Sequence, residues 1–342
     1  MNSRVFGLDI GTTLIKCALV KRDGNLFSLE SIAAVPSTPR GLTSESLIDL
    51  EALADAVRKM LSDANLKSTN VAFCIPENQI YTKVIEMPQL SEQELAAALK
   101  FEMEQYIPLP LDQVKTDWVV LERSEVAEKK TMDVMIVAAP ISIVQKYEKL
   151  SEMLNLKPET VEGEVVSVHR ALLPIVSTSV HLILHIGASA SSICIAKRGA
   201  IKTVVSLPTG GAAITRAISL DLGIDQAQAE SHKRAYGLSQ EALGGSVGKA
   251  VSPILESIAV DVKKAMLSFR EKNTDEAVSQ VVLSGGTSLL PGIGDFFAKD
   301  LNTQVVLGSC FAAYNMANVP QELLPQAPTF NAVVGLSLRN LL

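Results

Sequence analysis

The chain has 342 residues and a formal net charge of −6; 47% of its residues are hydrophobic and 4% are aromatic. This composition argues against nucleic-acid binding, which needs a basic surface or aromatic rings on which bases stack. No apolar run approaches the ~20 residues that cross a bilayer, and the first residues lack the apolar core of a signal peptide. We therefore expect a cytoplasmic protein, and its length predicts two lobes rather than one core.

The N-terminal part of the chain predicts a strand meander followed by a helix. Three antiparallel strands are expected near residues 4–9, 14–20 and 26–35, with turn residues between them. Apolar positions at helical spacing predict a helix over 49–65, and a short apolar run predicts a buried strand over 70–76. These elements form the first expected lobe.

The middle of the chain predicts an inserted α+β unit. Its elements follow in the order strand–helix–strand–strand–helix–strand, with a polar hairpin at 124–130. The first helix begins at Ser91, and Glu94 three residues later completes the pattern of a capping box. A unit of this size between two lobes is typical of an interaction module. The expected domains are a first lobe over 1–79, the inserted unit over 80–166 and a second lobe over 167–342.

The second lobe repeats the beginning of the first. Residues 5–24 are VFGLDIGTTLIKCALVKRDG and residues 181–200 are HLILHIGASASSICIAKRGA, and an offset of 176 aligns Gly11 with Gly187. The same offset places His185 where the first copy has Asp9. Small residues after a strand let the backbone approach phosphate oxygens closely. Together with a third glycine turn, SGGT at 284–287, the repeat predicts loops that converge on one phosphate-bearing ligand.

These motifs carry a resemblance to a known family. The order DIGTT, HIGAS, AESHKR and LSGGTSLLPG resembles the actin-like ATPase superfamily. The inserted unit, the run EMEQYIPLP and the C-terminal VVGLSLRNLL resemble the PilM family, the cytoplasmic actin-like component of type IV pilus assembly. The resemblance covers essentially the whole chain. It implies an α/β, actin-like (ribonuclease H-like) two-lobed fold with an SHS2-like insert, and a C-terminal helix that packs back on the first lobe.

The resemblance also implies a site for ATP or ADP with magnesium. Asp9 would orient the metal through water, and Lys16 would reach a phosphate oxygen, with a solvated strand lysine as the alternative. Glu230 and Lys233, three apart on a helix, would touch ribose and base, with an exposed ion pair as the alternative. The residues implied to bind nucleotide are Asp9, Gly11, Thr12, Thr13, Lys16, Gly187, Ala188, Ser189, Glu230, Lys233, Gly285, Gly286 and Thr287.

His185 departs from the pattern of the hydrolytic family members. Their aspartate at this position helps to hold the magnesium shell or the attacking water. A neutral imidazole cannot do the same electrostatic work, and a protonated imidazole repels the metal. We therefore expect nucleotide binding with weak or no hydrolysis and assign no catalytic residue. A packed histidine at the end of a strand is the alternative interpretation of His185.

By resemblance, the expected function is that of a scaffold in type IV pilus assembly. Its partner would be the cytoplasmic N-terminus of a PilN-like inner-membrane protein, so the chain would reach the membrane only through that partner. The resemblance also allows contact with the pilus assembly ATPases and with further copies of the chain. One alternative is an FtsA-like cell-division protein, which ends in a linker and a membrane helix, whereas this chain stops after a core-like helix. The other is a small-molecule kinase, which needs a carboxylate base where His185 stands.

Overall fold

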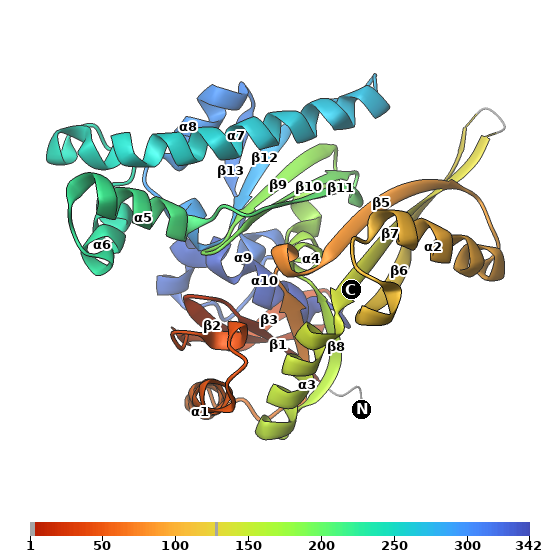
Figure 1. The fold of residues 1–342 in the computed structure, drawn as a ribbon, viewed down its shortest axis with the longest axis horizontal. Coiled ribbons are helices and arrows are strands. Elements are labelled where there is room, and N and C mark those ends of the chain that lie inside the picture. Colours follow the sequence, from red (N-terminus) through yellow and green to blue (C-terminus); the bar gives the residue numbers. More distant parts are fainter. Residues whose placement is uncertain (1–3, 127–128) are drawn as a thin grey trace.

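The computed structural model describes residues 4–126 and 129–342, whose strands form two five-stranded sheets and one three-stranded sheet (Figure 1). In the first sheet, an antiparallel meander is extended by two parallel strands. Its order is β3 (Leu26–Pro36), β2 (Leu14–Asp23), β1 (Val5–Ile10), β4 (Asn70–Ile75) and β8 (Lys157–Gly163).

The second sheet repeats this arrangement. Its order is β11 (Ala200–Leu207), β10 (Ser191–Lys197), β9 (Val180–Ile186), β12 (Gln280–Ser284) and β13 (Gln304–Leu307), again a meander followed by two parallel strands. Asp9 pairs with Lys16 in the first hairpin, and His185 pairs with Ser192 in the second. Both pairs are related by the offset of 176, so the repeat predicted from the sequence is confirmed in the strand register.

Two helices lie between the sheets. Apolar residues of α4 (Glu164–Val176) and α10 (Ala327–Leu338) form one core with β1, β4, β9 and β12. A second core joins α10 to β2 and β3, so the C-terminal helix packs on the first lobe (Figure 1). The outer faces of the sheets are covered by α1 (Leu47–Asp63) and α3 (Ile141–Leu154), and by α5 (Gly211–Leu222), α6 (Gln226–Tyr236), α7 (Ser246–Lys272) and α8 (Ile293–Leu301).

The inserted unit is a three-stranded sheet with one helix. Its elements are β5 (Tyr81–Pro88), α2 (Glu92–Tyr106), β6 (Val114–Val126) and β7 (Lys129–Pro140), in the sheet order β5-β7-β6. The capping box predicted at Ser91 and Glu94 is confirmed, because each side chain accepts from the other residue's backbone amide. Of the hairpin predicted at 124–130, residues 127–128 lie outside the described ranges.

The expected boundary of the inserted unit needs a correction. Strand β8 pairs with β4 in the first sheet, and Tyr147 and Leu150 of α3 pack in the core of the first lobe with Phe73. The inserted unit therefore covers Tyr81–Pro140 rather than 80–166. The order of elements along the chain could not reveal this, because strand pairing depends on which edge of which sheet is free.

The inserted unit contacts the second lobe through a cluster of charges. The Nζ of Lys202 in β11 lies 2.5 Å from Oδ2 of Asp133 in β7 and also pairs with Glu122 in β6.

None of the helices in residues 4–126 and 129–342 is both long and apolar enough to span a membrane.

Candidate functional site

A cleft of about 620 Å³ lies between the two lobes, and it is bordered by both hairpins and by the third glycine turn. Every residue predicted to bind nucleotide lines this cleft, although the residues come from separate parts of the chain. They are Asp9, Gly11, Thr12, Thr13, Lys16, Gly187, Ala188, Ser189, Glu230, Lys233, Gly285, Gly286 and Thr287.

The two hairpins make the same turn. The amide of Gly11 donates to the carbonyl of Leu14 at 3.0 Å, and the amide of Gly187 donates to the carbonyl of Ala190 at 2.9 Å. A Cβ on Gly11 would lie 2.7 Å from the Leu14 carbonyl oxygen, so the first turn requires glycine. Both glycine amides are therefore engaged within their turns and do not point at a ligand. Within the described part of the chain, the amides of Thr12, Thr13, Ala188 and Ser189 have no acceptor.

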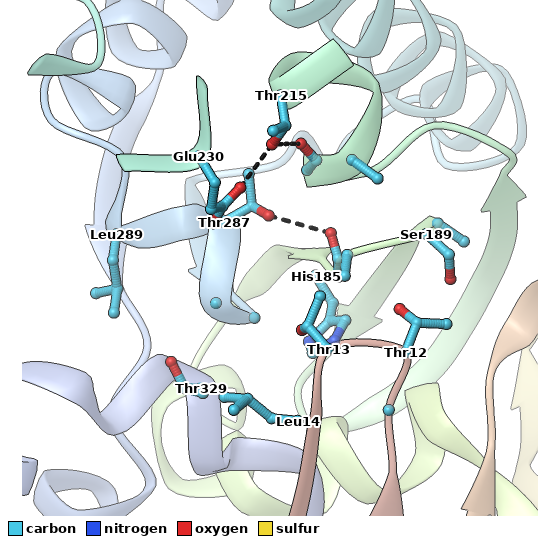
Figure 2. Close-up of a pocket in the computed structure, with 18 of the residues that line it drawn as sticks. Thr12, Thr13, Leu14, His185, Ser189, Thr215, Glu230, Thr287, Leu289 and Thr329 are labelled. Atoms are coloured by element: carbon cyan, nitrogen blue, oxygen red, sulfur yellow. Dashed lines mark hydrogen bonds between the residues drawn. The ribbon is translucent and has the colours of Figure 1, made fainter. Parts of the chain in front are cut away.

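These free amides change the role of the glycines from the one expected. The resemblance implied that Gly11 and Gly187 bind nucleotide, but their own amides close the turns that present their neighbours. Figure 2 shows Thr12 and Thr13 on the first hairpin and Ser189 on the second, all at the same cavity. Backbone amides and hydroxyl groups on opposed turns are the kind of donors that concave anion sites in proteins use.

Asp9 and Lys16 form a buried ion pair in the cleft. Asp9 is 4% exposed, and its Oδ2 lies 2.6 Å from Nζ of Lys16, which also donates to the carbonyl of Thr329 at 3.0 Å. The alternative of a solvated strand lysine is wrong. Burial by itself would lower the pKa of Lys16, but the charge and hydrogen bond of Asp9 outweigh burial and raise it. The lysine therefore enters the cleft as a cation.

His185 is both packed and part of the cleft. It is 5% exposed, its Nε2 lies 3.5 Å from Oε1 of Glu164, and its Nδ1 lies 3.1 Å from Oγ of Ser284. Ser284 accepts from Asn331 at 2.9 Å, which favours a serine proton directed at Nδ1 and an imidazole proton on Nε2. The imidazole N–H therefore faces the carboxylate of Glu164.

Glu164 supplies a carboxylate that the sequence analysis missed. It is the first residue of α4 and lines the cleft. Burial would raise the pKa of Glu164, but the interactions with His185 and the charge of Lys16 outweigh it and lower that pKa. An acidic residue that directly follows a strand and a glycine was a weak local signal. Nothing in the sequence placed it beside His185.

Glu230 and Lys233 form a second ion pair on the opposite side of the cleft. The Nζ of Lys233 lies 2.5 Å from Oε2 of Glu230, and the hydroxyl of Thr215 donates to the same oxygen at 2.6 Å. The alternative of an exposed ion pair is wrong, because Lys233 is 8% exposed. Burial would raise the pKa of Glu230, but hydrogen bonds from Lys233 and Thr215 lower it to about 2. Thr215, in α5, is a further lining residue that the sequence analysis missed (Figure 2).

The third glycine turn closes against the second hairpin. Gly285 has φ of +86°, and a Cβ there would lie 2.4 Å from the Ile186 carbonyl oxygen, so only glycine fits. The hydroxyl of Thr287 donates to the carbonyl of Gly187 at 3.1 Å. This contact fixes the third turn to the second hairpin at the base of the cleft.

The cleft offers no complete metal cage. Within the described ranges, no group of three or more His, Cys, Asp and Glu side chains could hold an ion. Mg²⁺ usually keeps several waters and uses one or two carboxylates together with substrate phosphates. Asp9 is a suitable carboxylate, so the residues present fit a magnesium ion that arrives with a polyphosphate.

Comparisons with known proteins agree along the whole chain. A family model described as type IV pilus assembly protein PilM matches residues 7–341. The chain is 24% identical over 374 residues to the cell division protein FtsA of Neisseria meningitidis, covering 96% of this chain and 88% of that protein.

Solved structures share the fold. A PilM-PilN type IV pilus biogenesis complex matches with a TM-score of 0.86 and 24% identity over 99% of both chains. MreB5 of Spiroplasma citri bound to AMPPNP matches with a TM-score of 0.52 and 13% identity, over 92% of this chain and 95% of that one. The expected α/β, two-lobed actin-like fold is therefore confirmed.

Proposed function

Because the chain belongs to the family of type IV pilus assembly proteins PilM, we propose that it is a pilus assembly scaffold that binds ATP or ADP in the interlobe cleft. The observation that carries nucleotide binding is the convergence of free amides from two equivalent hairpins on the cleft that holds Lys16. Such a site suits a polyphosphate, because its donors are fixed before the ligand arrives.

Each lobe would contribute to holding the phosphates. The amides of Thr12 and Thr13 would bind from one side and those of Ala188 and Ser189 from the other. Lys16 would turn from Asp9 toward a phosphate oxygen, which frees the carboxylate to orient magnesium through water. When bound, the metal supplies positive charge to the polyphosphate. MreB5 of Spiroplasma citri, which shares the fold, is bound to AMPPNP in its solved structure, and this supports nucleotide binding by this chain.

We propose that the cleft holds its nucleotide and hydrolyses it weakly or not at all. Hydrolysis needs a carboxylate or amide that orients an attacking water. Glu164 is a carboxylate beside His185, and its pair with His185 already engages it. Asp9, once Lys16 has turned to a phosphate oxygen, would be engaged in orienting the magnesium ion.

Calorimetric titration and a turnover assay test this proposal. Native protein is titrated with ATP and magnesium, then with ADP, and phosphate release is measured at saturation. We expect saturable binding of both nucleotides with little release. The variant His185→Asp places a carboxylate in the second lobe at the position equivalent to Asp9. The variant Glu164→Gln removes the carboxylate that lies beside His185. Brisk turnover by native protein that Glu164→Gln abolishes would contradict a holding role.

The proposed partner is the N-terminal cytoplasmic segment of a PilN-like membrane protein. Support comes from family membership and from the likeness to the solved PilM-PilN complex. We propose that the inserted, SHS2-like unit over Tyr81–Pro140 helps to form the binding groove, and that the partner holds the chain at the inner membrane. The alternative of an FtsA-like division protein has less support, because the family match along the chain is to PilM.

A peptide-binding measurement tests the partner. Fluorescence anisotropy would be recorded with labelled peptides from the cytoplasmic ends of pilus-system membrane proteins, and a scrambled peptide serves as the control. We expect saturable binding of the PilN-like peptide alone. Equal binding of the scrambled peptide, or no binding of any pilus-system peptide, would contradict the proposal.

A further inference from the structure

Glu77 is a buried carboxyl group outside the nucleotide cleft. It is 3% exposed and lies in the 3-10 turn η2 (Glu77–Gln79), which connects β4 of the first lobe to β5 of the inserted unit. The only other place where the described chain crosses between these parts is the junction of β7 and α3 at Pro140 and Ile141. Glu77 therefore lies at one of two covalent connections to the inserted unit.

The two oxygens of Glu77 hold two different elements. Its Oε1 accepts from the amide of Val165 at 3.1 Å, and its Oε2 accepts from the hydroxyl of Thr82 at 2.8 Å. Helix α4 begins after Gly163, which has no side chain to cap it. The carboxylate of Glu77 thus takes the place of a local cap for an N-terminal amide of α4. Through Thr82 it holds the beginning of β5.

This contact is tightly packed. A Cβ on Gly163 would lie 2.7 Å from Oε1 of Glu77 and 3.0 Å from Cδ1 of Ile80. Any side chain at Gly163 would displace the carboxylate. Cys194 of β10, in the second lobe, also lies near Glu77. Burial raises the pKa of the Cys194 thiol, and the charge of Glu77 raises that pKa further. Movement of the first turn of α4 relative to η2 is therefore transmitted to the Glu77 carboxylate through packed atoms on this side.

The cleft lies directly beside this contact. Pro76 and Glu164 line the cleft, while the residues that follow them, Glu77 and Val165, form the hydrogen bond behind it. On the far side, a cavity of about 260 Å³ between the inserted unit and β11 is lined by Glu77 and Thr82. In each of these two segments, the residue that lines the nucleotide cleft is therefore next in sequence to a residue of the contact that reaches the inserted unit.

We propose that Glu77 couples nucleotide occupancy of the cleft to the position of the inserted unit, by linking the first turn of α4 to Thr82 of β5. The proposal rests on the nucleotide binding proposed above. A polyphosphate places negative charge near Glu164, whose partner is His185. A change in that pair moves the first turn of α4, and the bond from the Val165 amide carries the movement to Glu77 and then to Thr82. Glu77 acts here as a positioning residue and touches no ligand.

Hydrogen exchange of the full chain, followed by mass spectrometry with and without ATP and magnesium, tests the coupling. In native protein we expect nucleotide to slow exchange in the hairpins and also in β5, by about five-fold. The variant Thr82→Val removes one hydroxyl and leaves the bond between Glu77 and Val165. We expect it to keep native ATP affinity and hairpin protection, and to lose the response in β5. Thr82→Ser retains the hydroxyl and the response, and Thr116→Val, at an exposed threonine of β6, is the matched control.

The outcomes separate this coupling from nucleotide binding itself. An unchanged β5 response in Thr82→Val, or a native protein that binds ATP without any response in β5, overturns the coupling and leaves nucleotide binding intact. Absence of calorimetric ATP binding in native protein overturns the proposed function and the coupling with it. Loss of the response in Thr82→Val together with its retention in Thr82→Ser supports the coupling, because a merely structural defect would appear in both variants or in the Thr116 control.

Discussion

Asp9 and Lys16 face each other across the first hairpin, with Oδ2 and Nζ 2.6 Å apart, and their counterparts in the second hairpin are His185 and Ser192. The hydroxyl of Ser192 is buried and has no hydrogen-bond partner within the described residues. One lobe therefore presents an ion pair to the cleft where the other presents an imidazole. The two hairpins thus have the same geometry but different charges at equivalent positions, and this difference supports the holding role proposed above.

The cation of Lys16 should carry much of the phosphate affinity. We expect Lys16→Ala to weaken ATP binding about ten- to a hundred-fold, because a charge-assisted hydrogen bond contributes about 1.5–3 kcal/mol. Titration calorimetry on protein shown to be folded by circular dichroism measures this effect. The matched control is Lys21→Ala, an exposed lysine on the same strand. Equal affinities for the two variants would remove Lys16 from the site.

The same substitution should also affect stability. Lys16→Ala leaves the 4%-exposed carboxylate of Asp9 without its cation. Breaking a buried pair by removing one partner costs about 3–5 kcal/mol. Urea unfolding of Lys16→Ala is compared with that of a double variant that also carries Asp9→Asn. The comparison tests whether the unpaired charge of Asp9 causes the loss of stability. The double variant should recover part of the loss, and a double variant less stable than the single one would contradict it.

Glu77 should make stability depend on pH. Burial raises its pKa from 4.5 to about 7, so between these values the folded protein keeps a proton that the unfolded chain releases. Stability from this group is therefore present below the unfolded pKa and is lost as the pH rises through about 7, by about 3 kcal/mol.

The variant Glu77→Gln lacks this proton and tests the prediction. Its stability relative to native protein should increase steadily as the pH rises from about 4.5 to about 7 and then level off. Urea unfolding at a series of pH values gives the difference. Glu104→Gln, at an exposed position of α2, is the control and should show no such trend. A constant difference between native protein and Glu77→Gln would show that Glu77 does not titrate in this range.

Two glycines should respond oppositely to alanine. Gly285 has φ of +86° and no room for a Cβ beside the Ile186 carbonyl, so Gly285→Ala should destabilise the protein by about 3 kcal/mol or more. Gly294 lies inside α8 with no atom within 4 Å of an added Cβ, so Gly294→Ala should stabilise by about 0.5–1 kcal/mol. Urea denaturation midpoints decide between these signs. A Gly285→Ala variant of native stability would mean that the third turn is not closed against β9.

Lys202 should hold the inserted unit against the second lobe. Its side chain is 16% exposed and lies between Asp133 and Glu122. We expect Lys202→Met to cost about 1–3 kcal/mol, because the Asp133 carboxylate, itself 17% exposed, loses its charged donor. Hydrogen exchange should rise in β6 and β7 while the first lobe is unchanged. Lys115→Met, at an exposed position of β6, is the control, and equal exchange in both variants would contradict the prediction.

Features defined by neighbouring residues could be predicted from the sequence. The capping box at Ser91 and Glu94 and the turns at Gly11 and Gly187 depend on groups within three residues of one another. The repeat then indicated that the two turns face a common ligand, since equivalent strands end at equivalent places. The ion pair of Asp9 and Lys16 was within reach of the same reasoning, because the hairpin register sets the two residues opposite each other.

The sequence by itself determined the duplicated strands, the three glycine turns and the family to which they point, because these depend on residue type and local spacing. Only the tertiary structure decided that β8 joins the first sheet, that Glu164 faces His185, and that Glu77 links α4 to β5. Each of these contacts joins segments that are distant in the chain, and which segments meet is decided by how the two sheets pack around α4 and α10.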